Sequence, residues 1–131
     1  MEVELLLRWS DTNNSTQGYE CYLHQAGEYV TITRWKGGAL SAPAGDANFD
    51  EIARVSFTTA PRNGDLFEAS IVGNIITVKL QGITLITADV SSGGRTPIAS
   101  GDPGIGFDTG GTGAETPSEN YGFSDFSATG L

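Results

Sequence analysis

The strongest structural signal in this chain is the stretch Leu66-Phe-Glu-Ala-Ser-Ile-Val72-Gly73-Asn74-Ile75-Ile-Thr-Val-Lys-Leu80-Gln81-Gly82-Ile83-Thr-Leu-Ile-Thr-Ala-Asp-Val90. Runs rich in β-branched residues are separated there by the two-residue links Gly73-Asn74 and Gln81-Gly82. Such links are typical of tight hairpins, because one or both of their residues need a positive φ angle. We therefore expect three successive antiparallel strands, at residues 66–72, 75–80 and 83–90.

The sequence on either side of this meander repeats the pattern of short strands bounded by turn residues. Residues 11–18 form a polar stretch and residues 39–48 an Ala-, Gly- and Pro-rich one without periodicity, so we interpret both as loops. Residues 50–54 fit either a strand or one helical turn. Further strands are expected at residues 2–9, 19–24, 29–36, 49–59, 105–107 and 121–128. Nine strands without a crossover helix predict an all-β antiparallel sandwich, as a single domain over residues 1–131.

The composition fits one small acidic domain. The 131 residues include 18 Gly and 5 Pro, and 16 acidic against 7 basic side chains give a formal charge of −9. This charge repels phosphate backbones, so we expect no nucleic-acid partner. The apolar stretches are far shorter than the roughly 20 residues that cross a bilayer, so we expect no membrane insertion. Cys21 is the single cysteine and cannot form an intramolecular disulfide.

A series of short motifs follows one another along the chain: Glu4-Leu-Leu-Leu-Arg8, Gly18-Tyr19-Glu20, Ile32-Thr-Arg-Trp-Lys-Gly37, Gly64-Asp65, Val72-Gly73-Asn74-Ile75-Ile76-Thr77-Val78, Leu80-Gln81-Gly82, Asp89, Ser100-Gly101-Asp102-Pro103-Gly104-Ile105-Gly106 and Ser124-Asp125-Phe126-Ser127-Ala128. In this order they resemble the concanavalin A-like lectin/glucanase jelly roll, in its laminin-G-like branch. The resemblance extends from about residue 3 to residue 129.

The resemblance also implies that this chain lacks the usual N-terminal strands, because family members begin before the strand that ends in Leu-Arg. Without those strands, residues 121–129 would present a free sheet edge or an uncovered part of the core. Three outcomes are open for this region: a partner chain covers it, the remaining strands rearrange, or the chain is a piece of a longer protein. We favour self-association and therefore expect a homo-oligomer in which a second copy covers this region. The first residues have no pattern of a secretion signal, whereas the resemblance implies an extracellular or cell-surface parent protein.

The sequence offers little catalytic chemistry. Glycoside hydrolases on this fold place paired carboxylates on one strand, and no Glu-X-Asp-X-X-Glu pattern occurs here. Glu2 and Glu4 share a strand face but lie at the start of the chain. His24 is the single histidine, and no Gly-X-Ser-X-Gly, phosphate-loop or Cys/His metal pattern accompanies it. We therefore expect no enzymatic activity.

The sequence predicts no required cofactor, but two of its features raise the question of a bound calcium ion. Asp46-Ala-Asn48-Phe-Asp50 repeats the first ligands of a calcium loop but lacks its central Gly and distal Glu. The resemblance implies a calcium ion near the final strand, where Asp125 is the matching residue. The alternative is that Asp125 accepts hydrogen bonds from backbone amides of the neighbouring loop.

Strand periodicity predicts a binding surface on the first three strands. We expect one face to be core, formed by Val3, Leu5, Leu7, Cys21, Leu23, Val30 and Ile32, with Trp9 on the same side as Val3, Leu5 and Leu7. The opposite face then carries Glu4, Arg8, Glu20, Tyr22, His24, Tyr29, Thr31, Thr33 and Trp35. Aromatic rings can stack on a pyranose while polar groups bind its hydroxyls. The predicted ligand-binding residues are Arg8, Tyr22, His24, Thr33 and Trp35.

These observations favour a non-catalytic, lectin-like carbohydrate-binding module whose partner is a glycan. One alternative is a structural, self-assembling sandwich that uses the same surface for a protein contact. A second alternative is the remnant of a glycoside hydrolase or polysaccharide lyase. Fold alone does not choose between them.

Overall fold

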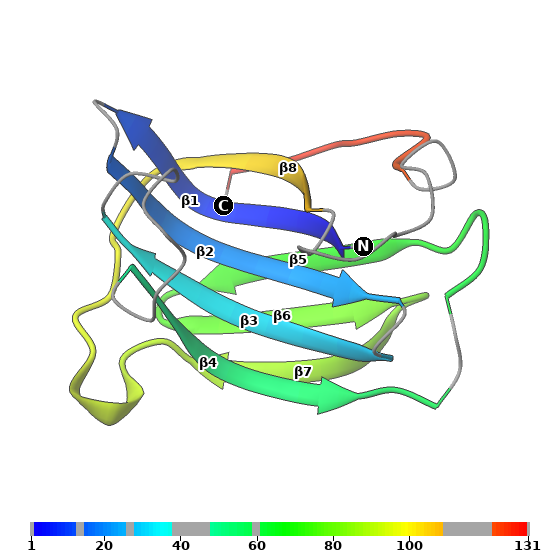
Figure 1. Ribbon diagram of the computed structural model, residues 1–131, viewed down its shortest axis with the longest axis horizontal. Helices are drawn as coiled ribbons and strands as arrows, with labels where there is room; N and C mark the ends of the chain where they lie inside the picture. Colours follow the sequence, from blue (N-terminus) through cyan, green and yellow to red (C-terminus); the bar gives the residue numbers. More distant parts are fainter. Residues whose placement is uncertain are drawn as a thin grey trace.

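A computed structural model describes residues 2–12, 15–25, 28–37, 48–58, 61–108 and 122–130. The chain is all-β, with two antiparallel sheets that face each other (Figure 1). Sheet A has the order β4-β3-β2-β1-β8 and sheet B the order β5-β6-β7. The strands of sheet A are β1 (Glu2–Thr12), β2 (Ser15–His24), β3 (Tyr29–Lys36), β4 (Phe49–Ser56) and β8 (Asp102–Asp108). Those of sheet B are β5 (Phe67–Val72), β6 (Ile75–Leu80) and β7 (Ile83–Asp89), followed by a 3₁₀ turn, Ser92–Gly94.

The β5–β7 meander confirms the strongest sequence prediction. Gly73 and Gly82 adopt positive φ angles of 58° and 73°, and Gln81 one of 52°. Both links are therefore the tight turns that their residues predicted. The β5–β6 register follows from its turn throughout, whereas the β6–β7 pairing shifts by one residue between Val78 and Lys79.

The core lies between the two sheets, and the predicted inward face is confirmed. Leu5, Cys21, Leu23, Val30 and Ile32 are buried, and Val3 and Leu7 pack against them. Sheet B contributes Ile76, Val78 and Ile86 from its inner face. Tyr19 is fully buried, and its hydroxyl accepts a hydrogen bond of 2.8 Å from the backbone N–H of Ile98.

Three element predictions need correction. The described part of the polar stretch 11–18 is strand rather than loop, because β1 extends to Thr12 and β2 begins at Ser15. β8 begins at Asp102, earlier than the strand expected at residues 105–107, whereas the strand expected at residues 49–59 is confirmed as β4, in place of the alternative helical turn. Residues 122–128 of the expected ninth strand have no strand pairing, and all residues from 124 to 130 are exposed. Most of the loop predicted at 39–48, and Tyr121, lie outside the described residues.

A bulge in β1 overturns the predicted orientation of two side chains. The pairing of β1 with β2 shifts between Leu7 and Ser10, and Arg8 adopts a positive φ of 50°. Trp9, expected on the core side, instead lies against Trp35 with the rings 6.1 Å apart. Arg8 reaches towards sheet B, where its guanidinium donates to the carbonyls of Gly73 and Ile98. Side chains alternate between the two faces of a strand only where no residue is inserted. The bulge therefore explains why the predicted orientations of Arg8 and Trp9 were wrong.

Candidate functional site

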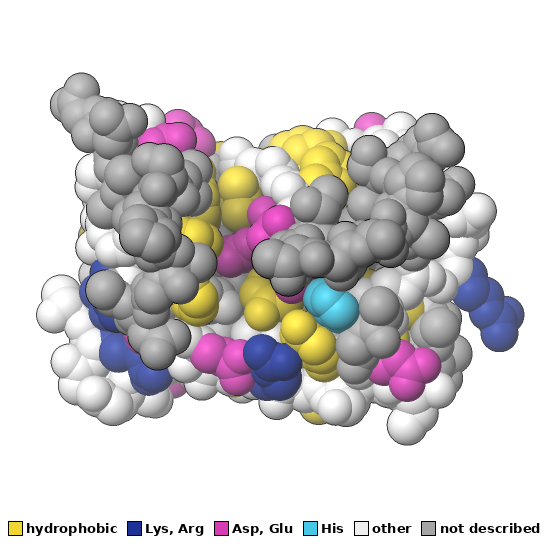
Figure 2. All heavy atoms as spheres, in the orientation of Figure 1, with side chains coloured by type: hydrophobic (Ala, Val, Ile, Leu, Met, Phe, Trp, Pro, Cys, Tyr) yellow, Lys and Arg dark blue, Asp and Glu magenta, His cyan; other side chains and the backbone are white. Residues whose placement is uncertain are grey.

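The candidate site is the face of sheet A that points away from sheet B, called here the outer face. Antiparallel register places directly paired residues on the same side of a sheet, so the outer face consists of rows of neighbouring side chains. These rows are Glu2, His24 and Tyr29; Glu4, Tyr22, Thr31 and Arg54; Leu6, Glu20, Thr33 and Glu51; and Gly18, Trp35 and Phe49, joined by Trp9. Figure 2 shows acidic side chains gathered at the centre of this face, beside hydrophobic ones.

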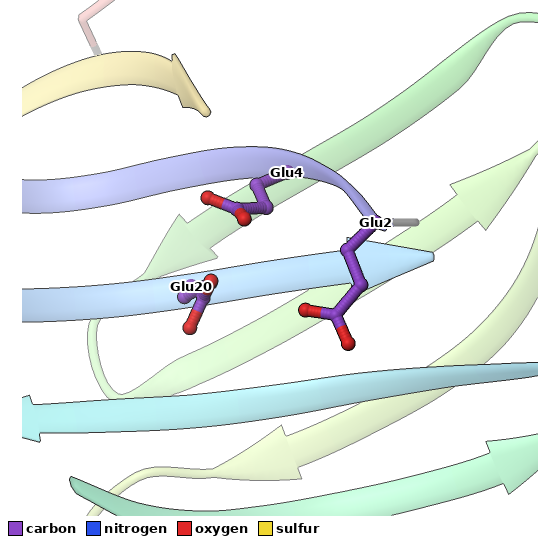
Figure 3. Close-up of side chains that lie close together, drawn as sticks. All are labelled: Glu2, Glu4 and Glu20. Atoms are coloured by element: carbon purple, nitrogen blue, oxygen red, sulfur yellow. The ribbon is translucent and has the colours of Figure 1, made fainter. Parts of the chain in front are cut away.

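Three glutamates form the centre of the outer face, Glu2 and Glu4 from β1 and Glu20 from β2 (Figure 3). One carboxylate oxygen of each lies within 4.8 Å of the others. Glu4 and Glu20 are each only 8% exposed. The carboxylate of Glu4 also occupies the space that a Cβ atom would need at Gly106 of β8. We call Glu2, Glu4 and Glu20 the carboxyl cluster.

Burial and mutual repulsion make the carboxyl cluster hold protons tightly. Burial raises the pKa of Glu4 to about 8, and the negative charge of Glu20 adds to the effect. Burial likewise raises the pKa of Glu2 to about 7, with a smaller contribution from Glu20. The pKa of Glu20 is also raised by burial, opposed by a hydrogen bond of 2.7 Å from Trp35 Nε1 to its Oε2. Near neutral pH the cluster therefore carries less than its full negative charge.

Aromatic rings border the carboxyl cluster on the side of Trp35. The ring of Trp35 meets the ring of Trp9 edge to face, and its centre lies 5.3 Å from the centre of the Phe49 ring. Gly18 makes this arrangement fit, because a Cβ atom there would come within 2.6 Å of the Trp9 ring. The φ angle of Gly18 is +152°, which also disfavours any other residue.

A second aromatic group borders the cluster at the other end of the strands. The ring of Tyr29 is stacked on His24 at 4.8 Å and meets Tyr22 edge to face at 6.1 Å. The guanidinium of Arg54 lies 4.0 Å from the centre of the Tyr29 ring and is also paired with Glu51. The charge of Arg54 is therefore already compensated on this face.

The structure brings four of the five predicted ligand-binding residues to the outer face: Tyr22, His24, Thr33 and Trp35. Thr33 is buried, whereas the other three are partly exposed. Arg8 does not join them, because the β1 bulge directs it towards Gly73 and Ile98. Trp9 takes a place on this face that the sequence did not predict for it.

Sequence reasoning missed the carboxyl cluster. Periodicity placed Glu4 and Glu20 on one face, but not beside each other. Their proximity follows from the β1–β2 register, in which Glu4 pairs with Tyr22 and Leu6 with Glu20. The hairpin that pairs Thr12 with Ser15 does not set that register alone, because the bulge between Leu7 and Ser10 shifts the pairing by one residue before Leu6 and Glu4. The interpretation of 11–18 as a loop hides the hairpin, and no local signal marks the bulge.

The residues considered for calcium lie apart from this cluster. Asp125 is exposed, and its Oδ1 accepts a hydrogen bond from the backbone N–H of Phe126. Asp50 is paired with Arg95 at 2.8 Å and with Lys36 at 3.6 Å, while Asp46 lies outside the described residues. The carboxyl cluster itself offers one oxygen atom from each of three glutamates, all within 4.8 Å of one another, and we assign no metal to it.

The outer face therefore combines partly protonated carboxyl groups with partly exposed aromatic side chains. Such carboxyl groups both donate and accept hydrogen bonds, and the rings offer apolar contact. Among the described residues there is no helix long and apolar enough to span a membrane. No protein-family model, curated protein or solved structure matches this chain.

Proposed function

We propose that this chain is a non-catalytic glycan-binding domain, and that its binding site is the outer face of sheet A. The observation that carries the proposal is the arrangement of this face, with Trp9, Trp35 and Phe49 on one side of the carboxyl cluster and Tyr22, His24 and Tyr29 on the other. We further propose that the two sheets follow the concanavalin A-like jelly roll of the laminin-G-like type, as the motif order suggests.

The chemistry of a sugar fits this arrangement. One face of a pyranose is apolar and packs on an aromatic ring, while its hydroxyl groups need hydrogen-bond donors and acceptors. Trp35 supplies a ring and, through its contact with Glu20, a fixed orientation. The carboxyl cluster lies between two aromatic groups, so one sugar chain can contact all three.

The absence of catalysis is part of the proposal. A general acid or base must reach the proton that it transfers. Glu4 and Glu20 instead form a hydrogen bond with each other, and Glu20 also accepts one from Trp35. These contacts support a binding role for both carboxyl groups.

A glycan array tests the proposal, followed by titration of the best ligand. Trp35→Ala should weaken binding at least tenfold, because it removes a stacking ring and a contact of Glu20. The matched control is Val72→Ala, at a residue 61% exposed on the outer face of sheet B, which should bind like the parent chain. Circular dichroism checks the fold of both variants. A folded chain that binds no glycan contradicts the proposal, and turnover of a bound polysaccharide contradicts its non-catalytic part.

One further observation favours a second candidate function, self-assembly. Ile105 and Phe107 pair with Leu5 and Val3, so they point towards the core side, yet they are 39% and 51% exposed. Sheet B has fewer strands than sheet A, and edge strand β8 is left partly uncovered on its inner side. Contact with a second copy would cover these side chains. Light scattering tests this: Phe107→Ser should convert an oligomer to a monomer, and a parent chain that is already monomeric at high concentration rules it out.

A further inference from the structure

We propose that one end of the sandwich binds the acidic group of a sugar, a carboxylate or a sulfate, through Arg34, Lys36 and Arg95. We call these three residues the basic cluster. The inference depends on the proposed glycan-binding function and specifies its substrate class. Short glycans that carry a uronate or a sulfate belong to this class, while neutral glycans with the same backbone do not.

The basic cluster surrounds one acidic residue, Asp50. Arg95 Nε donates to Asp50 Oδ2 at 2.8 Å, and Lys36 Nζ lies 3.6 Å from Asp50 Oδ1. Arg34 is directly opposite Asp50 in the β3–β4 register, so both side chains are on the same side of the sheet. Three of the seven basic side chains of the chain therefore gather around a carboxylate whose single negative charge cannot compensate all three. Figure 2 shows basic side chains gathered at the left of the view, where β3 ends and β4 begins in Figure 1.

Arg34 gives an independent indication of a ligand. Its Nε is buried without a hydrogen-bond partner, and its guanidinium makes no ion pair among the described residues. The acid opposite it, Asp50, is instead engaged by Arg95 and Lys36. A buried donor without a partner costs free energy, and an oxyanion that accepts from the edge of the guanidinium would remove this cost. Arg34 as a whole is only partly buried, so its guanidinium is within reach of a ligand.

The chemistry of the basic cluster suits an oxyanion. A guanidinium is planar and offers parallel N–H groups to two oxygen atoms of one carboxylate or sulfate. Arg95 is held in place, because its Nε donates to Asp50 and its Nη1 to the carbonyl of Ser92. The side chains of Lys36 and Arg95 are 34% and 25% exposed, so an anion can approach them without a change of fold.

The position of the basic cluster connects it to the proposed glycan site. Trp35 stands between Arg34 and Lys36 in the chain, and Phe49 directly precedes Asp50. Neighbouring Cα atoms are about 3.8 Å apart, and their side chains point to opposite faces of a strand. Because β3 ends at Lys36 and β4 begins at Phe49, a glycan stacked on Trp35 can continue past the strand ends and place its next sugar at the basic cluster.

The charge of the whole chain restricts the class to short glycans. At a formal charge of −9, a long polyanion would be repelled along its length. A single acidic group at the basic cluster responds mainly to the charges that it contacts, because salt screens exposed charges beyond about 8 Å at physiological ionic strength. The carboxyl cluster is on the opposite face of sheet A, since Arg34 pairs with the core residue Tyr19.

A glycan array tests the inference when it is printed with neutral, uronate and sulfated forms of the same short backbones. In titrations at physiological salt, the acidic forms should bind at least tenfold more tightly than their neutral counterparts. Comparison of the uronate with the sulfated form identifies which anion is bound. Inorganic sulfate should compete with the acidic forms. An aspartate trimer should bind at least tenfold more weakly than the best acidic glycan, because it has no pyranose face.

Variants locate the preference. Arg34→Gln and Arg95→Gln should each reduce the preference for the acidic form to less than threefold. Arg62→Gln is the matched control, because it changes the net charge equally but lies in the connection between β4 and β5, beyond the opposite end of β4. It should leave the preference unchanged. Two cluster variants are used, with circular dichroism on each, so that one that fails to fold does not decide the result.

The outcomes separate this inference from the proposed function. Equal or tighter binding of the neutral forms overturns the inference but not the proposed function, as does equal binding of the aspartate trimer. A preference that persists in both cluster variants, or that is lost equally in Arg62→Gln, overturns the assigned site. No binding of any glycan overturns the proposed function itself, and this inference with it.

Discussion

The outer faces of the two sheets differ. That of sheet B is an ordinary solvent-facing surface, whereas that of sheet A carries the candidate site. On sheet B, the rows are Glu68, Lys79 and Thr84; Ser70, Thr77 and Thr87; and Val72, Ile75 and Asp89. None of these side chains is buried, and Glu68 pairs directly with Lys79. On sheet A, by contrast, Glu4, Glu20, Thr31 and Thr33 are polar and buried. Buried carboxyl groups are costly, so stability alone does not explain their presence.

The largest difference in stability between the two sheets is expected for alanine substitutions at two glycines. Gly18→Ala places a methyl group against Trp9 at a positive φ, so it should lower the free energy of unfolding by about 3 kcal/mol. Gly73→Ala, in the open β5–β6 turn, meets no atom within 4 Å and should cost about 1 kcal/mol from its backbone conformation alone. Urea denaturation measures both, and equal losses would show that Trp9 does not occupy the space above Gly18.

The next largest effect is expected when the indole N–H donor of Trp35 is removed. Trp35→Phe keeps a ring but deprives Glu20 of its hydrogen bond, so stability should fall by about 2 kcal/mol. It should also raise the pKa of Glu20, because that hydrogen bond opposes the effect of burial. Urea denaturation measures the first effect and carboxyl titration by NMR the second. A pKa that does not move would place the Trp35 donor elsewhere; Thr77→Val on sheet B is the matched control.

Carboxyl groups on the two sheets should make the stability of the chain depend on pH in opposite directions. The pKa values of Glu2 and Glu4 are raised in the folded chain, to about 7 and about 8, from an ordinary 4.5. Their contribution is present below pH 4.5 and is lost as pH rises towards 8, because the unfolded chain releases these protons first. Asp65 and Asp89 beside sheet B have lowered pKa values, through hydrogen bonds from Arg62 and Ser91, so their contribution is lost in acid below about pH 4.

Thermal unfolding across this range measures both effects. The parent chain should be less stable at pH 8.5 than at pH 5.5, by on the order of 1 kcal/mol after allowance for solvent screening. Glu4→Gln should flatten this slope, while Asp89→Asn should affect only the acid side. A chain that gains stability between pH 5.5 and pH 8.5 would show that the cluster is ionised and solvated.

The smallest effect is expected for the charge pair on sheet B. Glu68→Gln and Lys79→Gln should each change stability by less than about 0.5 kcal/mol, because exposed cross-strand pairs contribute little. A double-mutant cycle measures their coupling. A coupling above 1 kcal/mol would remove much of the contrast drawn between the two outer faces.

The elements whose structure is determined by neighbouring residues could be predicted from the sequence. Gly73-Asn74 and Gln81-Gly82 fix their turns, so the meander was predicted to within one residue at its ends. The alternation of Leu5, Cys21, Leu23, Val30 and Ile32 likewise identified the core face. Both signals lie within a few neighbouring residues, and each was confirmed.

Features set by contacts between distant segments could not be predicted. Nothing in the residues around Arg8 favours a positive φ, and the bulge depends on its hydrogen bonds to Gly73 and Ile98 in sequence-distant segments. The carboxyl cluster depends on a register set by the hairpin at Thr12 and Ser15 together with the bulge between Leu7 and Ser10. Residues 122–128 were expected to form a strand but make no ladder with a described neighbour.

The contact of Arg8 with the β5–β6 turn ties the bulge in sheet A to sheet B. Arg8 precedes Trp9 within the bulge, and its guanidinium donates to the carbonyl of Gly73 at 3.0 Å and to that of Ile98 at 2.8 Å. The residue that begins the aromatic border of the outer face, Trp9 against Trp35, is therefore next in the chain to a side chain anchored on the opposite sheet.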